Sequence, residues 1–184
     1  MRIIAGTAKG IRLGPVPPGV RPVSDRAREG LFSSLGDRVP GAQVLDLYAG
    51  TGALGIEALS RGASSAVFVE SGPRAARGIR ANLETTGLEG LAAVRRREVL
   101  PFLRAEVEPF QGAGICLLDP PYATPHRELE EALRLLGERW QRVGKWTVAL
   151  TRPVRDDTIV IPVNWRDARR LVYGDSLVIL YQEV

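Results

Sequence analysis

The segment Asp119-Pro120-Pro121-Tyr122 carries the residue types best suited to chemistry in this chain of 184 residues. Two successive prolines exclude a helix and remove two backbone donors, which leaves carbonyl oxygens accessible on a stiff backbone. An aromatic amino group is a poor nucleophile because its lone pair is delocalised into the ring. The Asp119 carboxylate and the Pro120 carbonyl would accept its two N–H bonds and aim that lone pair at a methyl donor. Tyr122 would stack on the nucleic-acid base that carries this amino group. The alternative interpretation is that the segment is only a turn that ends a strand and places an aromatic side chain in the core.

A glycine-rich turn forms the second chemical signature. Gly50, Gly52 and Gly55 fit the pattern G-x-G-x-x-G, and Glu70 ends the next predicted strand, 18 residues after Gly52. A dinucleotide-binding fold places its ribose-binding acid at that position, so an NAD-dependent oxidoreductase is one interpretation of this turn.

Asp46 favours a different ligand for the same turn. It lies four residues before Gly50, where a carboxylate would repel a pyrophosphate. S-adenosylmethionine carries a sulfonium and an ammonium group, and carboxylates attract both. The string Asp-x-x-x-Gly-x-Gly resembles the S-adenosylmethionine loop of class I methyltransferases. The resemblance implies that Glu70 holds the ribose hydroxyls and that the loop residues contact the cofactor, namely Asp46, Tyr48, Ala49, Gly50 and Gly52.

Glu98 is a further candidate cofactor ligand. It follows the strand-like run Leu91–Arg95, and methyltransferases of this class often place Asp there to contact the adenine amino group, whereas this chain has Glu. Three arginines, residues 95–97, directly precede it. A solvated, charged turn is therefore the alternative interpretation of this segment.

Strand and helix patterns alternate from residue 43 onward and must position these groups. Such alternation predicts a parallel sheet with helices on both faces. The predicted strands are Val44–Tyr48, Ala66–Glu70, Leu91–Arg95, Gly114–Asp119 and Trp146–Leu150. The predicted helices are Gly52–Ser60, Pro73–Thr85, Val99–Val107 and Arg127–Arg139, with an earlier one that Ser24 caps and that runs to about Leu35.

The two ends of the chain depart from this alternation. Arg170–Tyr173 and Leu177–Tyr181 flank Gly174-Asp175-Ser176, which indicates a C-terminal antiparallel hairpin. Arg2–Ala5 and Ile11–Leu13 predict a small N-terminal β-hairpin. The expected fold is therefore an α/β, Rossmann-like methyltransferase sheet. We expect one domain over residues 1–184, with a hairpin extension at 1–20 and a catalytic core at 21–184.

Composition narrows the class of protein. Net charge is +4, and 45% of residues are apolar, as in an ordinary soluble domain. The chain shows no bilayer-spanning run and no secretory signal, and no Cys/His spacing that fits a metal, so we expect a cytoplasmic protein without metal. Cys116 lies in an apolar run and is interpreted as a buried core thiol, and His126 as a surface helix start rather than part of the pocket.

Positive charge is concentrated near the N-terminus. Residues 1–28 hold six cations against one acid, which fits binding to RNA phosphates. The alternative is a solvated charged face. The six candidate RNA-binding residues are Arg2, Lys9, Arg12, Arg21, Arg26 and Arg28.

The chain as a whole resembles the bacterial 16S rRNA guanine-N2 methyltransferases. The resemblance rests on three strings, Arg21–Phe32, Leu45–Gly62 and Asp119–Tyr122, together with Arg2–Gly6. It implies S-adenosylmethionine as cofactor and methyl transfer to N2 of a guanine, in 16S rRNA or a small-subunit assembly intermediate. Apart from the resemblance, we expect a monomer that binds no membrane. The residues alone do not distinguish guanine N2 from adenine N6 in DNA or RNA. They also leave open a non-catalytic RNA-binding module.

Overall fold

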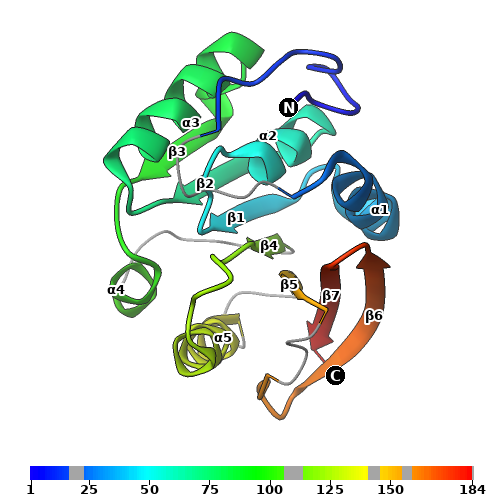
Figure 1. Cartoon of the computed structure of the whole chain (residues 1–184), viewed down its shortest axis with the longest axis vertical. Coiled ribbons are helices and arrows are strands. Elements are labelled where there is room, and N and C mark those ends of the chain that lie inside the picture. The colour runs from blue at the N-terminus through cyan, green and yellow to red at the C-terminus, as the bar shows by residue number, and fades with distance from the viewer. Residues whose placement is uncertain (17–22, 106–113, 141–145, 155–158, 184) are drawn as a thin grey trace.

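A seven-stranded sheet organises the protein in the computed structural model, which describes residues 1–16, 23–105, 114–140, 146–154 and 159–183 (Figure 1). The strand order is β3-β2-β1-β4-β5-β7-β6. The first five strands run parallel, and β7 pairs antiparallel with both β5 and β6. The strands are β1 Gln43–Leu47, β2 Ser65–Val69, β3 Ala92–Arg95, β4 Gly114–Leu118, β5 Trp146–Pro153, β6 Trp165–Tyr173 and β7 Ser176–Glu183.

Helices cover both faces of this sheet, as the alternating pattern predicts. One face packs against α1 (Asp25–Leu35), α2 (Ala53–Ser60) and α3 (Pro73–Thr86), and the other against α4 (Val99–Arg104) and α5 (His126–Trp140). Strand side chains alternate between the two cores: Val44 and Ile115 belong to the first, Leu45 and Cys116 to the second. Fully buried parallel strands explain the nearly continuous apolar runs. In the described part of the chain no helix is both long and apolar enough to cross a bilayer.

The register of β1 and β4 brings the two sequence motifs together. Leu47 pairs with Leu118, so the residues that follow both strands emerge side by side at the carboxyl edge of the sheet. The Asp119 amide donates to the Leu47 carbonyl at 3.5 Å and extends this pairing by one step. Ligands bind at this edge in open α/β sheets.

The β6–β7 hairpin folds back onto the same edge. Because β7 is antiparallel to β5, Ser176 at the start of β7 pairs with Pro153 at the end of β5. The turn that connects β6 to β7 therefore lies beside the loops that follow β1 and β4. A register shift between Asp167 and Arg169 marks an irregularity in β6. Both strands are longer than the sequence runs indicated.

The first sixteen residues form an arm that lies across α2 and α3 (Figure 1). The predicted N-terminal hairpin is reduced to one isolated antiparallel bridge between Arg2 and Arg12, with flanking hydrogen bonds such as Ile3 N to Ile11 O at 3.0 Å. Instead of a strand ladder, packing onto the helices orders the arm, because Ile3, Ala8 and Leu13 enter the first core.

Most predicted elements lie within two residues of their expected bounds. The predicted helix Val99–Val107 ends at Arg104, and its last two predicted residues lie outside the described part of the chain. Two short 3-10 helices, Gly36–Arg38 and Glu89–Leu91, were not predicted. Ser24 is the N-cap of α1, as expected, and its hydroxyl accepts a hydrogen bond from the Ala27 amide at 3.2 Å.

Candidate active site

The loop of residues 48–52 connects β1 to α2 and is called the cofactor-type loop below. Two carboxylates hold its shape. Asp46 Oδ2 accepts the Gly55 amide at 2.9 Å, in the first turn of α2. A side chain at position 55 could not fit, because its Cβ would lie 2.3 Å from the Phe68 ring. Glu70 accepts the Gly50 amide at 2.8 Å and the Gly72 amide at 2.6 Å. Two acids therefore hold the turn in which the glycines stand.

Burial dominates the electrostatics of Asp46. The side chain is 1% exposed, and its Oδ1 has no hydrogen-bond partner among the described residues. Loss of solvation raises the pKa of this carboxyl well above its usual value, and nearby Asp119 and Glu70 add to the rise, while the Gly55 amide opposes it. A site with this excess of carboxylate favours a cationic ligand and disfavours a pyrophosphate.

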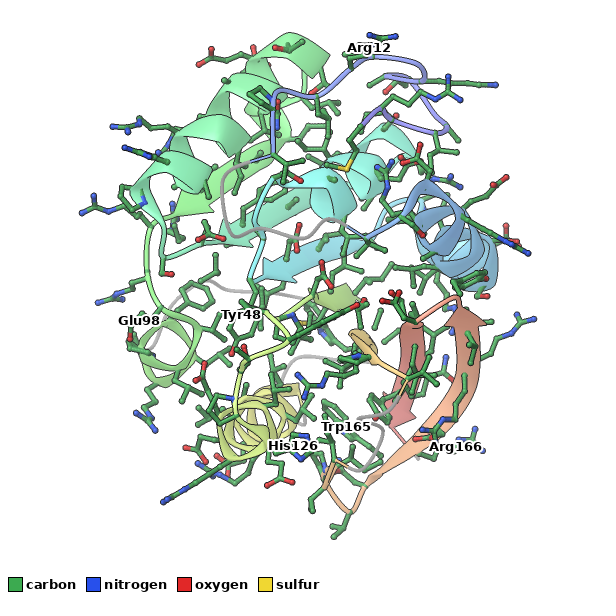
Figure 2. All side chains as sticks on the ribbon, in the orientation of Figure 1. Arg12, Tyr48, Glu98, His126, Trp165 and Arg166 are labelled. Carbon is green, nitrogen blue, oxygen red and sulfur yellow. The ribbon has the colours of Figure 1, made fainter. Side chains whose placement is uncertain are left out.

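Tyr48 directly follows β1 in a backbone conformation that non-glycine residues rarely adopt, with φ of 59°. Its hydroxyl donates to Glu128 Oε1 on α5 at 3.0 Å. Burial, followed by the charge of Glu128, raises the pKa of this phenol, so the hydroxyl keeps its proton as a donor. Figure 2 shows Tyr48 between the sheet edge and α5. The pair joins the loop after β1 to the helix that follows the Asp-Pro-Pro-Tyr segment.

The Asp-Pro-Pro-Tyr segment follows β4 as expected, and its acid, Asp119, is half-buried. Pro120 is buried, whereas Pro121 and Tyr122 are exposed. Burial raises the pKa of Asp119 to about 7. The Tyr122 hydroxyl lies 3.3 Å from the Ser176 hydroxyl at the start of β7. The segment is thus held between the sheet edge and the hairpin turn.

These loops surround one cavity of about 970 Å³. Its lining includes every candidate cofactor residue except Gly52, and all four residues of the Asp-Pro-Pro-Tyr segment. Glu98 lies at its rim, exposed, as N-cap of α4 (Figure 2). The apolar side chains of Val99, Leu100 and Pro101 form the adjoining wall. A cavity of this size fits a nucleoside-sized ligand and a second planar group.

Sequence reasoning missed several lining residues. Glu128 and Thr151 line the cavity, as do residues 173–176 of the β6–β7 turn. The glycine-containing turn was visible as a hairpin signal. Its place at the cavity was not, because that depends on β7 inserting between β5 and β6.

Asn82 on α3 is another residue that the sequence did not single out. It is 5% exposed, its Oδ1 accepts the Gly14 amide at 2.7 Å, and its Nδ2 donates to the Thr51 carbonyl at 2.9 Å. One amide side chain therefore bridges the N-terminal arm and the cofactor-type loop. Glu57 on α2 completes the attachment by accepting the amides of Ile4 and Ala5 at 2.8 and 3.0 Å.

The predicted RNA-binding cations have different surroundings. Arg2, Lys9, Arg12 and Arg26 are exposed, whereas Arg21 lies outside the described residues. Arg28 is completely buried; it donates to Asp25 and to the Arg2 carbonyl and lies 3.7 Å from Glu57. These contacts show that Arg28 links α1 to the N-terminal arm and to α2. Arg26 and Arg28 also line the cavity, and the RNA-binding role of these cations stays a prediction.

The remaining candidates lie outside the cavity lining. Cys116 is a buried free thiol whose pKa is raised by burial, so the expectation of a core residue is confirmed. His126 is exposed at the first residue of α5 (Figure 2). Among the described residues no three His, Cys, Asp or Glu side chains converge in a way that could hold a metal ion.

The sheet order and the acidic loop define the class of protein. The domain is a Rossmann-like class I methyltransferase domain. It combines a mostly parallel sheet that contains the antiparallel strand β7, Asp46 next to a glycine-rich turn, and an Asp-Pro-Pro-Tyr segment after β4. The dinucleotide-binding alternative is not supported, because the buried Asp46 carboxylate occupies the Gly55 amide in the first turn of α2, where a dinucleotide fold offers free amides to a pyrophosphate.

Known proteins identify the family. The family described as "Conserved hypothetical protein 95" matches residues 1–182. Ribosomal RNA small subunit methyltransferase D of Escherichia coli K12 is 36% identical over 99% of this chain and 89% of its own length, and that of Haemophilus influenzae is 34% identical over 99% and 93%. The solved structure of YhhF from Escherichia coli has a TM-score of 0.85 and 34% identity, covering 100% of this chain and 97% of its own. The chain belongs to the Conserved hypothetical protein 95 family.

Proposed function

We propose that the protein transfers a methyl group from S-adenosylmethionine to the exocyclic N2 of a guanine in 16S rRNA. The observation that carries the proposal is the adjacency of Asp119, after β4, to the acidic loop after β1 in one cavity. The names of the Escherichia coli and Haemophilus influenzae relatives supply the substrate class, RNA of the small ribosomal subunit.

The residues present fit the cofactor. Asp46 is buried and has one oxygen without a partner, and Glu70 keeps acceptor capacity for hydroxyl groups although both of its oxygens bind backbone amides. The loop from Tyr48 to Gly52 would pass along the methionine end, and Glu98 would reach the adenine end beside Val99 and Leu100. When bound, S-adenosylmethionine supplies an electrophilic methyl group on a sulfonium.

The catalytic contribution of the chain is to orient and polarise the amine. The Asp119 carboxylate and the Pro120 carbonyl accept the two hydrogens of the guanine amino group, which turns its lone pair out of the ring system. The same acceptors offset the positive charge that develops on the nitrogen as the new C–N bond forms and the bond between the methyl group and sulfur breaks, which leaves S-adenosylhomocysteine. Asp119, with a pKa near 7, can take up the proton that the methylated amine releases. Tyr122, 38% exposed, offers its ring to stack on the base.

Methylation of unmodified 16S rRNA tests the proposal. The wild-type protein should transfer labelled methyl groups and yield N2-methylguanosine after digestion. The variant Asp119→Asn keeps the size of the side chain but replaces an acceptor oxygen by a donor, and Asp119→Ala removes it. Both should lose at least 100-fold in rate while binding S-adenosylhomocysteine nearly as well as wild type, on the order of what one lost transition-state partner costs. Unchanged rates, or N6-methyladenosine as the product, would refute the assignment.

A further inference from the structure

A group of arginines lies on the outer side of α3 and at the end of β3, and all of them except Arg97 lie outside the lining of the proposed active site. We call it the β3-edge cluster; it consists of Arg74, Arg77, Arg80, Arg95, Arg96 and Arg97. The segment that contains it, residues 73–98, has six arginines against three glutamates. Together with residues 1–28 it accounts for the basic character of the protein, because acidic residues outnumber basic ones in the remainder of the chain.

Helix geometry and two contacts place these arginines on one surface. Ala75, Ala76 and Ile79 face the core, so Arg74 and Arg77 project from the opposite side of α3. The Arg80 guanidinium reaches the Val94 carbonyl of β3 at 3.4 Å. β3 is the edge strand of the sheet, and Figure 1 shows it with α3 on the side of the molecule away from β6.

The turn after β3 joins this surface to the rim of the cavity. The Arg97 amide donates to the Glu70 carbonyl at 3.2 Å, and Glu70 is three residues before the start of α3. Arg97 and Glu98 both line the cavity. The cluster therefore begins at the mouth of the active site and continues outward along α3.

Four of these arginines form no ion pair with another residue that the structure describes. Arg74, Arg77, Arg96 and Arg97 are exposed, and within the described residues none of them forms an ion pair. Arginines elsewhere differ, as Arg134 on α5 shows by binding both Glu131 and Glu138. Uncompensated positive charge concentrated at one edge creates a field that attracts an extended anion.

We propose that the β3-edge cluster binds the phosphate backbone of the RNA on the strand next to the target nucleotide. The planar guanidinium group suits phosphate oxygens, and contacts of this kind position a nucleic acid without reading its sequence. The cluster would act together with the exposed cations of the N-terminal arm. The identity of the RNA rests on the proposed function, whereas the charge complementarity does not.

Salt dependence of RNA binding measures the number of phosphate contacts. The test variant carries Arg74→Gln, Arg77→Gln and Arg96→Gln. These three side chains are exposed, do not line the cavity and form no ion pair with another described residue. The control carries Arg134→Gln, Arg166→Gln and Arg169→Gln on α5 and β6, with the same change in net charge. Binding to an unmodified 16S rRNA transcript is titrated at several salt concentrations, together with a calorimetric titration of S-adenosylhomocysteine.

The test variant should lower the slope of log K against log salt concentration by about 2, since each phosphate contact contributes roughly 0.7–0.9. Its affinity for S-adenosylhomocysteine should stay unchanged, and the control should keep the wild-type slope. Equal loss in both triple variants, or no loss in the test variant, would overturn the proposal. Displacement of the RNA by polyglutamate as efficiently as by unlabelled RNA would overturn it too, in favour of an acidic protein partner. A protein that binds RNA in this way yet methylates no guanine would refute the proposed function alone.

Discussion

The Tyr48 hydroxyl donates a hydrogen bond of 3.0 Å to Glu128 and so ties the loop after β1 to α5. Tyr48 adopts a left-handed backbone conformation, which costs about 1–2 kcal/mol for a residue with a Cβ. Partial burial of its ring against the second core and this hydrogen bond hold it there. Glu128 stands only six residues after Tyr122, so the contact sets the distance between the cofactor loop and the segment that would hold the base.

Removing that hydroxyl should weaken the coupling between the two loops. We expect Tyr48→Phe to lower kcat/KM about fivefold, equivalent to the loss of roughly 1 kcal/mol from one hydrogen bond. Glu128→Gln keeps an acceptor and should retain activity, whereas Glu128→Ala should match Tyr48→Phe. Steady-state methylation assays on Tyr48→Phe, on Glu128→Ala and on the variant that carries both substitutions measure this coupling. Losses that add fully in the double variant would show that the two side chains act independently.

The pKa of Asp119, about 7, predicts a pH-dependent reaction. The carboxylate is the acceptor that orients the amine, so kcat/KM should rise with pH through the region near 7 and level off above it. A bound sulfonium would move the midpoint downward. Rate profiles between pH 5 and 9 provide the measurement, with Asp119→Asn as the control that should lose this dependence. A wild-type rate independent of pH below 7 would contradict the assigned role.

The same carboxyl should also affect stability, with the opposite sign from a typical acid. Its folded-state pKa lies above the unfolded value of 3.8, so the folded protein loses stability from this group as pH rises from about 4 to above 7. Asp119→Asn should therefore raise the free energy of unfolding at pH 8, by an amount on the order of 1 kcal/mol, and much less at pH 4. Urea unfolding at the two pH values checks this. An equal effect at both would rule out the burial of charge as its cause.

The attachment of the arm gives a matched pair of glycine variants. Gly6 and Gly10 both have φ of 85°, but a Cβ at Gly6 would lie 1.7 Å from the Ser60 carbonyl oxygen, whereas a Cβ at Gly10 meets open space. Gly10→Ala should cost about 1–2 kcal/mol from backbone strain alone. Gly6→Ala should cost about 1–3 kcal/mol more because α2 must move. Denaturant titrations measure both, and equal losses would mean that the arm does not pack on α2 as described.

Asn82 should link this arm to cofactor binding. Asn82→Asp keeps the oxygen that accepts the Gly14 amide, but it replaces the nitrogen that donates to the Thr51 carbonyl by a second oxygen. The two oxygens repel each other, which should cost about 1–3 kcal/mol of free energy. We expect its affinity for S-adenosylhomocysteine to fall by about tenfold, equivalent to about 1.4 kcal/mol. Asn82→Leu, which loses both hydrogen bonds, should also reduce the free energy of unfolding. Calorimetry that finds wild-type affinity in Asn82→Asp would show that Thr51 does not depend on this bridge.

The parts of the site that come from local sequence were predictable, and those that come from topology were not. Asp46, the glycine turn and the Asp-Pro-Pro-Tyr segment each follow a recognisable apolar strand, and parallel strands present their carboxyl ends at one edge. Glu128 and Ser176 reach the cavity only because α5 packs beside β4 and because β7 inserts between β5 and β6. Arg28 has the sequence context of an exposed cation, and its burial depends on Glu57, 29 residues away.

The most direct measurement of the central claim is nucleoside mapping of 16S rRNA by mass spectrometry. The RNA is taken from cells that lack the gene and from the same cells after its return, as wild type or as Asp119→Ala. Our account predicts that one N2-methylguanosine disappears with the gene, returns with the wild-type protein and stays absent with the variant. An unchanged 16S rRNA methylation pattern in the deletion strain, or the loss of a methyl group from a different position on a base, would contradict it.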